Sequence, residues 1–218
     1  MSSELLLCYK KDAPETPICV SRDEYYKDLY GKYNDYNPAI VDIFMFNRYG
    51  ELIMQRRSKK KRIMPGRLHT AAGGHINWGE TAELSVVHEC VEELGTAPVT
   101  LPKELYGDAI KKLDPYMNRF ALITLHKEWF RYDDRDDEDV IKDRMWLYFG
   151  IYNGPIICED RSSSGFELAD LDTLMKDIKE NPDIYTVGLR HYLQDFEDDL
   201  RAFVKTHCLA AGKEAVVS

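Results

Sequence analysis

Apolar residues near the start of the chain come in two short runs separated by polar turn formers. Residues 4–9 and 17–20 have the composition of strands, so they predict a hairpin. Ser21 is placed to cap a short helix that ends at Gly31, where the turn-rich sequence YGKYNDYNP begins. We therefore expect three parts: an extension at 1–36, a main domain at 37–207 and a frayed tail at 208–218.

The middle of the chain changes from a strand pattern to a helical one. Residues 39–46 form an apolar run, and residues 51–56 return from a turn as its hairpin partner. A helix is expected from near Glu80 to Gly95, because the glycine is well placed as a C-terminal cap. Four apolar residues recur at helical spacing and are expected to form the buried stripe of this helix: Leu84, Val87, Val91 and Leu94.

The second half of the chain continues the alternation of strands and helices. Two longer strands are predicted at 119–128 and 144–152, with an acidic, solvated loop between them. A helix is expected at 168–179, where apolar spacing starts at Leu168, and a last helix at 186–207.

Composition and charge narrow the functional classes. A net charge of -9 argues against a binder of nucleic-acid polymers or membrane surfaces, although metal ions can still bring a phosphorylated small molecule to an acidic protein. The five cysteines are scattered and form no Cys-x-x-Cys pair, which favours a reducing, cytoplasmic location. The apolar run from Leu5 to Cys8 is too short for a signal peptide, so we expect none, and we expect no membrane helix because no apolar run is long enough.

Three glutamates in the predicted central helix carry the first chemical signal. Glu89, Glu92 and Glu93 stand three and four residues apart, so they share a face and repel one another. Such a cluster is often only a solvated helix face. It also suits a hard divalent cation such as Mg²⁺ or Mn²⁺, which prefers oxygen ligands.

The surrounding spacing separates these two interpretations. The segment GHINWGETAELSVVHECVEELGT resembles the Nudix box, G-x5-E-x7-R-E-U-x-E-E-x-G-U, where U is a bulky aliphatic residue. Six of the nine fixed positions match: Gly74, Glu80, Glu89, Glu92, Glu93 and Gly95. The resemblance implies a Nudix-type α/β/α sandwich, in which a mixed sheet lies between helices and carries the N-terminal hairpin extension.

The resemblance also implies roles for these residues. Glu89, Glu92 and Glu93 become the expected metal ligands and catalytic residues, with the carbonyl of Gly74 joining the metal shell. Glu80 is expected to orient its neighbours. A bound metal ion lowers the pKa of water and neutralises charge on a diphosphate.

Three positions depart from the box. His88 stands in the arginine position, Cys90 in the first aliphatic position and Thr96 in the last. Histidine is shorter than arginine and offers fewer donors, so His88 predicts weaker positioning of the glutamates or an altered pH dependence.

The order of segments around the box resembles the Nudix subgroup near the isopentenyl-diphosphate isomerases. Those isomerases carry a cysteine just before a Gly-His pair, whereas Gly73 stands in that position here. Isomerases also tend to lose box glutamates, which this chain keeps. Hydrolysis is therefore favoured over isomerisation.

Several residues outside the helix are candidates for the same site. Arg56 and Arg57 are expected to contact substrate phosphates, and His75 to line the site. The resemblance further suggests a later glutamate as base, and the sequence does not select among three candidates: Glu128, Glu138 and Glu159.

The predicted reaction is metal-assisted attack of water on a diphosphate bond of a small molecule, such as a nucleoside diphosphate linked to another group. The main alternative is a catalytically weak or inactive Nudix module that binds a nucleotide. A homodimer is possible, through either the N-terminal hairpin or residues 145–152.

Overall fold

The computed structural model describes residues 4–27, 36–133, 141–158 and 163–208. The strands are β1 Leu5–Lys10, β2 Pro17–Ser21, β3 Tyr36–Phe46, β4 Leu52–Arg57, β5 Leu68–His69, β6 Ala72–His75, β7 Pro98–Thr100, β8 Ala121–Asp133, β9 Ile141–Ile151 and β10 Ser163–Ala169. The helices are α1 Arg22–Lys27, α2 Ala82–Glu89, α3 Lys103–Leu113, α4 Leu171–Glu180, α5 Val187–Asp195 and α6 Glu197–His207. A π-helical turn, Cys90–Leu94, continues α2, and short 3₁₀ turns occupy Asp114–Tyr116 and Pro182–Ile184.

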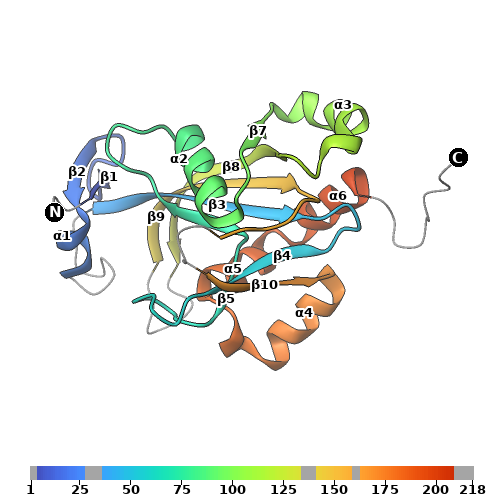
Figure 1. The fold of residues 1–218 in the computed structure, drawn as a ribbon. Helices are drawn as coiled ribbons and strands as arrows, with labels where there is room; N and C mark the ends of the chain where they lie inside the picture. The colour runs from blue at the N-terminus through green and yellow to red at the C-terminus, as the bar shows by residue number, and fades with distance from the viewer. Residues whose placement is uncertain (1–3, 28–35, 134–140, 159–162, 209–218) are drawn as a thin grey trace, which may run out of the picture.

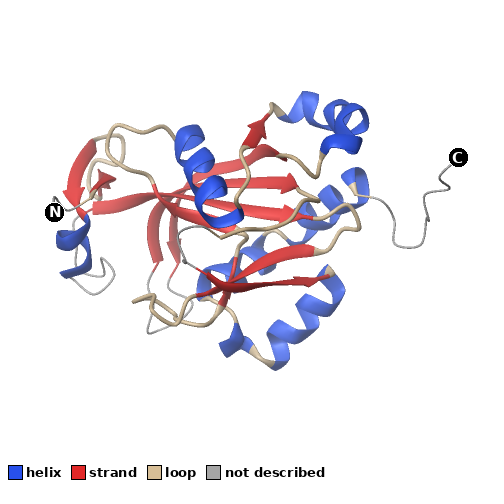
Figure 2. Cartoon of the chain, viewed as in Figure 1, coloured by secondary structure: helices blue, strands red, loops and turns tan. Residues whose placement is uncertain are grey.

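A mixed sheet organises these elements in the order β10-β4-β3-β9-β8-β7 (Figure 2). Strand β3 runs parallel to β9, and β7 runs parallel to β8, while the other pairs are antiparallel. Along its length β3 also pairs with β1, then β6, then β4. Strand β3 therefore holds the N-terminal extension next to β6, which carries Gly74, and β4, which carries Arg57.

Alternation along β3 sends its side chains to opposite faces of the sheet. Val41 and Ile43 join the core beneath α2. Phe44 and Phe46 join the core beneath α3 to α6, which lie on the other face (Figure 1). This arrangement confirms the expected α/β/α sandwich with a mixed sheet.

The N-terminal hairpin is confirmed as β1 and β2, and Glu24 N–H donates to Ser21 Oγ at the start of α1. Its first strand pairs with the beginning of β3, where Cys8 lies opposite Pro38. The rest of the predicted first helix and the acidic loop at 134–140 lie outside the described residues, as does the tail from residue 209.

Two predictions for the later helices need correction, and one helix was missed. Leu168 belongs to strand β10 and is exposed, because the segment pairs with β4 before the helix begins at Leu171. The predicted last helix is divided at Phe196, which has non-helical backbone angles and a buried ring. Helix α3 was not predicted, although its buried Tyr106 donates a hydrogen bond to the carbonyl of Leu122.

The predicted buried stripe of the central helix is also wrong. Leu84 and Val91 are exposed, while Ala82, Val86 and Cys90 are buried together with Leu94. The true stripe contains small residues because α2 lies close to β3 and β6, and small side chains permit that approach. Apolar periodicity alone favoured the larger residues on the outer face.

Residues 145–152 do not offer a free edge for a second copy of the chain. Strand β9 has β3 on one side and β8 on the other, so both of its edges are paired. Within the described part of the chain, no helix combines the length and apolar character needed to span a membrane.

Helix α2 begins at Thr81, whose Oγ1 accepts a hydrogen bond from the backbone N–H of Leu84 at 3.3 Å. Replacing Thr81 by alanine removes this cap and is expected to lower the free energy of unfolding by about 1 kcal/mol. Urea denaturation of wild type, Thr81→Ala and Thr81→Ser measures the effect. The serine variant should stay near wild type, and an equal loss in both variants would contradict the capping role.

Candidate active site

The glutamates of the predicted box line one cavity of about 470 Å³. Helix α2, its π-helical turn and the loop residue just before the helix supply one wall, which we call the acidic wall: Glu80, Glu89, Glu92 and Glu93. The π turn ends at Gly95, whose left-handed φ of 69° closes the helix as expected from the sequence. Such wide turns inside helices often occur at functional sites.

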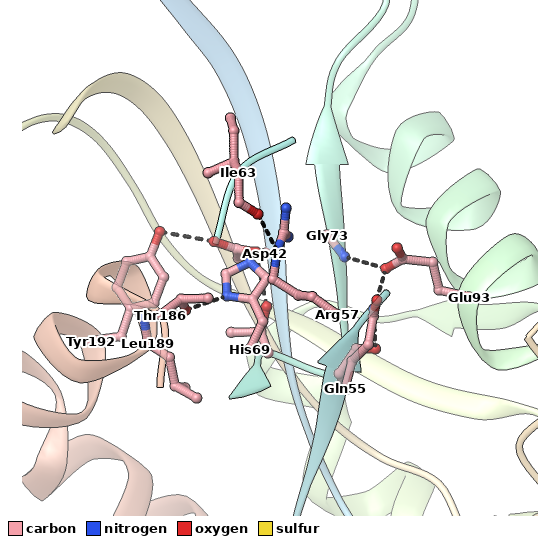
Figure 3. A network of polar contacts seen from close by, with 12 residues as sticks. Asp42, Gln55, Arg57, Ile63, His69, Gly73, Glu93, Thr186, Leu189 and Tyr192 are labelled. Carbon is pink, nitrogen blue, oxygen red and sulfur yellow. Dashed lines mark hydrogen bonds and ion pairs between the residues drawn. The ribbon is translucent and has the colours of Figure 1, made fainter. Parts of the chain in front are cut away.

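Glu93 is held by the sheet beneath the helix. Its Oε2 accepts hydrogen bonds from Gln55 Nε2 at 2.8 Å and from the backbone N–H of Gly73 at 3.1 Å (Figure 3). The side chain is buried, so these bonds offset the desolvation of its charge. One carboxylate of the acidic wall therefore has a fixed position relative to β4 and β6.

Glu89 lies directly against Gly74. A Cβ atom built at residue 74 would stand 2.1 Å from Glu89 Oε1, so only glycine leaves room for this carboxylate. Burial, together with the nearby charges of Glu93 and Glu92, raises the pKa of Glu89 to about 8. Lys61 and Arg22 oppose this effect only in part.

These carboxylates form an incomplete cation site. Within the described residues, no three acidic, histidine or cysteine groups are close enough to form a ready cage. Mg²⁺ seldom needs one, since it commonly binds one or two carboxylates and fills its shell with water and substrate phosphates. The Glu89 carboxylate fits such an ion, because Gly74 has no side chain to cover it and the charges of Glu92 and Glu93 are nearby.

Glu80 and His88 pair with each other. His88 Nδ1 lies 3.2 Å from Glu80 Oε1, and Ser85 Oγ donates to Glu80 Oε2 at 2.9 Å. The histidine side chain is half exposed. The residue in the arginine position of the box therefore contacts Glu80 and not the three glutamates that follow it.

The two neighbouring arginines of β4 point to different surroundings. Arg57 lines the cavity, where its Nε donates to the carbonyl of Ile63 at 3.1 Å (Figure 3). Its guanidinium lies within electrostatic reach of Glu93 and Asp42, but among the described residues it forms no ion pair. Arg56 instead donates to Glu167 and to the carbonyl of Gly66, so the structure does not bring it to the cavity.

His75 lines the cavity beside the N-terminal extension. Its ring lies edge-on to Tyr25, with centroids 5.0 Å apart. Burial, together with the charge of Arg22, lowers the pKa of His75 to about 3. The imidazole is therefore neutral, and its Nε2 has no hydrogen-bond partner within the described residues.

Of the three candidate later glutamates, Glu128 lies within the described residues. Glu128 accepts hydrogen bonds from Arg144 and is not among the residues that line the cavity. Glu138 and Glu159 lie outside the described residues.

The opposite wall of the cavity was missed in the sequence. We call it the α5 wall, and its members are Asp42, His69, Arg131, Thr186, Gly188 and Tyr192. Their sequence signal is weak, because strand pairing and helix packing bring together positions far apart in the chain.

Buried Asp42 is the centre of this second wall (Figure 3). Its oxygens accept hydrogen bonds from Thr70 Oγ1 and Tyr192 Oη, both at 2.9 Å, and His69 Nε2 lies 3.4 Å away. Burial opposes its charge, but His69, Arg131 and the bond from Tyr192 together hold the pKa of Asp42 below its usual value.

A β-bulge directs Arg131 into this wall. The pairing of β8 with β9 skips His126, since Leu125 faces Tyr148 and Lys127 faces Leu147. One extra residue moves every later side chain of a strand to the opposite face. Arg131 thereby reaches the α5 side, where it forms a paired contact with Asp143 and stacks over the ring of Tyr192, 4.7 Å from its centroid.

Comparison with known proteins bears on the family to which the chain belongs. The chain is 31% identical over 113 residues to a Nudix hydrolase of Nostoc sp., which covers 51% of this chain and 64% of the relative. An isopentenyl-diphosphate Delta-isomerase of Shigella flexneri is 35% identical over 65 residues, covering 30% of this chain and 35% of the isomerase. The chain thus spans less than two thirds of the length of these curated relatives.

Solved structures share the fold at low identity. A protein from Deinococcus radiodurans superposes with a TM-score of 0.56 at 19% identity, covering 82% of this chain and 90% of that one. A Nudix hydrolase from Alicyclobacillus acidocaldarius gives 0.51 at 11% identity, covering 81% and 98%. The family model described as NUDIX domain matches residues 36–181, which is most of the chain. The chain therefore belongs to the Nudix family.

Proposed function

We propose that the protein is a metal-dependent hydrolase that cleaves a diphosphate bond in a small molecule, such as a nucleoside diphosphate linked to another group. The observation that carries this proposal is the pairing of opposite charges across one cavity. Carboxylates that suit a divalent cation line the acidic wall, and the guanidinium of Arg57 faces the same space. A diphosphate needs both, since its charge is neutralised by metal ions and by arginine.

The acidic wall supplies the proposed metal site. Glu89, Glu92 and Glu93 are the proposed ligands of Mg²⁺ or Mn²⁺, with the carbonyl of Gly74 beside them. When bound, the ion lowers the pKa of a water molecule and stabilises charge on the phosphates. Glu93 is kept in place by Gln55 and by the N–H of Gly73, which limits the rearrangement needed to bind the ion.

Glu80 and His88 have a supporting role in this proposal. Their contact, together with the hydrogen bond from Ser85, fixes the chain just before the three glutamates. Arg57 orients a phosphate, and its Nε bond to Ile63 restricts the rotation of its guanidinium.

Geometry at Gly73 disfavours the isomerase alternative. A Cβ atom at residue 73 would lie 2.2 Å from Asp42 Oδ1 and 2.8 Å from the carbonyl oxygen of Val41. The cysteine found at this place in the related isomerases has no room here without a shift of the backbone of β3. Strand β3, which carries Asp42, therefore requires glycine at residue 73 of the neighbouring strand β6.

Replacing Glu93 by glutamine is expected to lower kcat/KM by on the order of 100-fold or more, because the variant loses a charged ligand at the metal site. Steady-state hydrolysis of ADP-ribose with Mg²⁺ or Mn²⁺ measures the change. Glu83→Gln is the matched control, since Glu83 lies on the exposed face of the same helix. Metal-dependent turnover that survives in Glu93→Gln would contradict the assignment. No turnover of any diphosphate by the wild type, with nucleotide binding intact, would identify a binding module instead.

Replacing Arg57 by alanine is expected to raise KM by on the order of 10- to 100-fold, the equivalent of losing a charged hydrogen bond to phosphate. Its neighbour gives the control, because Arg56 pairs with Glu167 away from the cavity. Arg56→Ala should therefore leave KM within about twofold of wild type. Equal losses in the two variants would point to a general effect of charge and exclude a specific phosphate contact.

A further inference from the structure

Residues 69–74 lie between the two walls of the cavity, and we call them the glycine segment. Gly74 faces the acidic wall, since a Cβ atom there would lie 2.1 Å from Glu89 Oε1. Gly73 faces the α5 wall, since a Cβ atom there would lie 2.2 Å from Asp42 Oδ1. Because carboxylates contact the segment from both sides, a displacement at Asp42 also moves the backbone that lies against Glu89.

Asp42 holds the glycine segment at three points. Its Oδ1 accepts a hydrogen bond from Thr70 Oγ1 at 2.9 Å, lies 3.4 Å from His69 Nε2 and packs against Gly73. The backbone N–H of Gly73 in turn donates to Glu93 Oε2 at 3.1 Å. The Asp42 side chain therefore contacts the same residue whose amide holds a proposed metal ligand.

Helix α5 restrains Asp42 and the start of the glycine segment together (Figure 3). Tyr192 Oη donates to Asp42 Oδ2 at 2.9 Å. At the start of the helix, the backbone N–H of Thr186 donates to the carbonyl of Leu68 at 2.8 Å, and Thr186 Oγ1 lies 2.9 Å from His69 Nδ1. One helix thus fixes both the carboxylate and the residues that the carboxylate binds.

The hydroxyl of Tyr192 is separable from the rest of its side chain. The buried ring packs edge-on to Phe44, with centroids 6.0 Å apart, and the guanidinium of Arg131 lies 4.7 Å from the ring centroid. Tyr192→Phe keeps both contacts, because neither involves the hydroxyl. The variant removes the hydrogen bond to Asp42 Oδ2, and a buried carboxylate oxygen that loses its donor is unfavourable. We expect the carboxylate to rotate away from the glycine segment.

We infer that Tyr192 and Asp42 are positioning residues for the carboxylates of the acidic wall, and that they act through the glycine segment. Neither side chain binds the metal ion. The inference rests on the proposed hydrolase function, because it concerns the metal site of that function. It gives helix α5 a part in metal binding, although α5 and α2 cover opposite faces of the sheet (Figure 1).

Calorimetric titration with Mn²⁺ tests this inference by comparing wild type, Tyr192→Phe and Tyr106→Phe. The control loses a similar bond, since the buried Tyr106 donates to the carbonyl of Leu122 at 2.7 Å and does not line the cavity. Tyr192→Phe should weaken Mn²⁺ binding on the order of 10-fold, the lower end of the effect of outer-shell partners of a metal. Tyr106→Phe should stay within about twofold of wild type, because distant sites do not couple.

Turnover provides a readout that a loss of stability does not reproduce. With ADP-ribose as substrate, Tyr192→Phe should need on the order of 10-fold more Mg²⁺ to reach half of its maximal rate. Saturating Mg²⁺ should then restore kcat to the wild-type value, since the acidic wall keeps all of its carboxylates. A kcat that stays low at saturating Mg²⁺ would overturn the inference.

Two results of the titration would also overturn it: wild-type affinity for Mn²⁺ in folded Tyr192→Phe, or an equal loss of affinity in Tyr106→Phe. Thermal unfolding verifies the fold of each variant. If Tyr192→Phe does not fold, Thr70→Val replaces it, because this change removes the hydrogen bond to Asp42 Oδ1 without altering any charge. Unchanged affinity for Mn²⁺ in Thr70→Val then overturns the inference.

These outcomes are distinct from a failure of the proposed function. Absence of saturable Mn²⁺ binding in the wild type would exclude the metal-dependent hydrolase, and the positioning role with it. Saturable binding in the wild type that Tyr192→Phe leaves unchanged would keep the hydrolase and remove only the positioning role.

Discussion

The close approach of helix α2 to strand β6 is the constraint on which the site depends. Glu89 occupies the space where a side chain at residue 74 would begin, so the strand must carry glycine there. The preceding residue, Gly73, meets Asp42 in the same way. Two adjacent glycines thus let carboxylates from two directions reach the backbone of one short strand, and neither position accepts even a methyl group without displacement.

The same approach concentrates negative charge. The pKa of Glu89 is raised to about 8 by burial and by Glu93 and Glu92, which means that its charged form is unfavourable in the protein alone. A divalent cation reverses this balance, because it becomes the largest local charge. The repulsion among the carboxylates lowers the free energy of unfolding, and binding of the ion raises it again. Arg57, fixed on the opposite side through Ile63, completes a field suited to a diphosphate.

Local signals in the sequence predicted much of this arrangement. The start of the helix near Glu80, the cap at Gly95 and the spacing of the glutamates are properties of a single helix, and the structure has them as expected. The buried face of that helix was mistaken, because tight packing selected Ala82 and Cys90 over the larger Leu84 and Val91. Apolar periodicity does not report how near a helix lies to its sheet.

The α5 wall could not be predicted because it depends on distant pairings. Arg131 faces Tyr192 only because a bulge at His126 shifts the register of β8, and no residue type marks that bulge in the sequence. Thr186 meets His69 through the packing of α5, more than a hundred residues further along the chain. The same limit holds for Arg56 and Arg57. Their side chains point to opposite sides of β4, but the sequence does not show which side faces the cavity.

Mn²⁺ binding measured by electron paramagnetic resonance tests the central claim most directly. Wild type should bind Mn²⁺ saturably, and Gly74→Ala should weaken that binding on the order of 10- to 100-fold by displacing Glu89. Gly107→Ala serves as control, since its added Cβ would have no neighbour nearer than 3.5 Å. Equal Mn²⁺ affinity in wild type and Gly74→Ala would contradict the account, because the contact between Gly74 and Glu89 would then have no part in holding the ion.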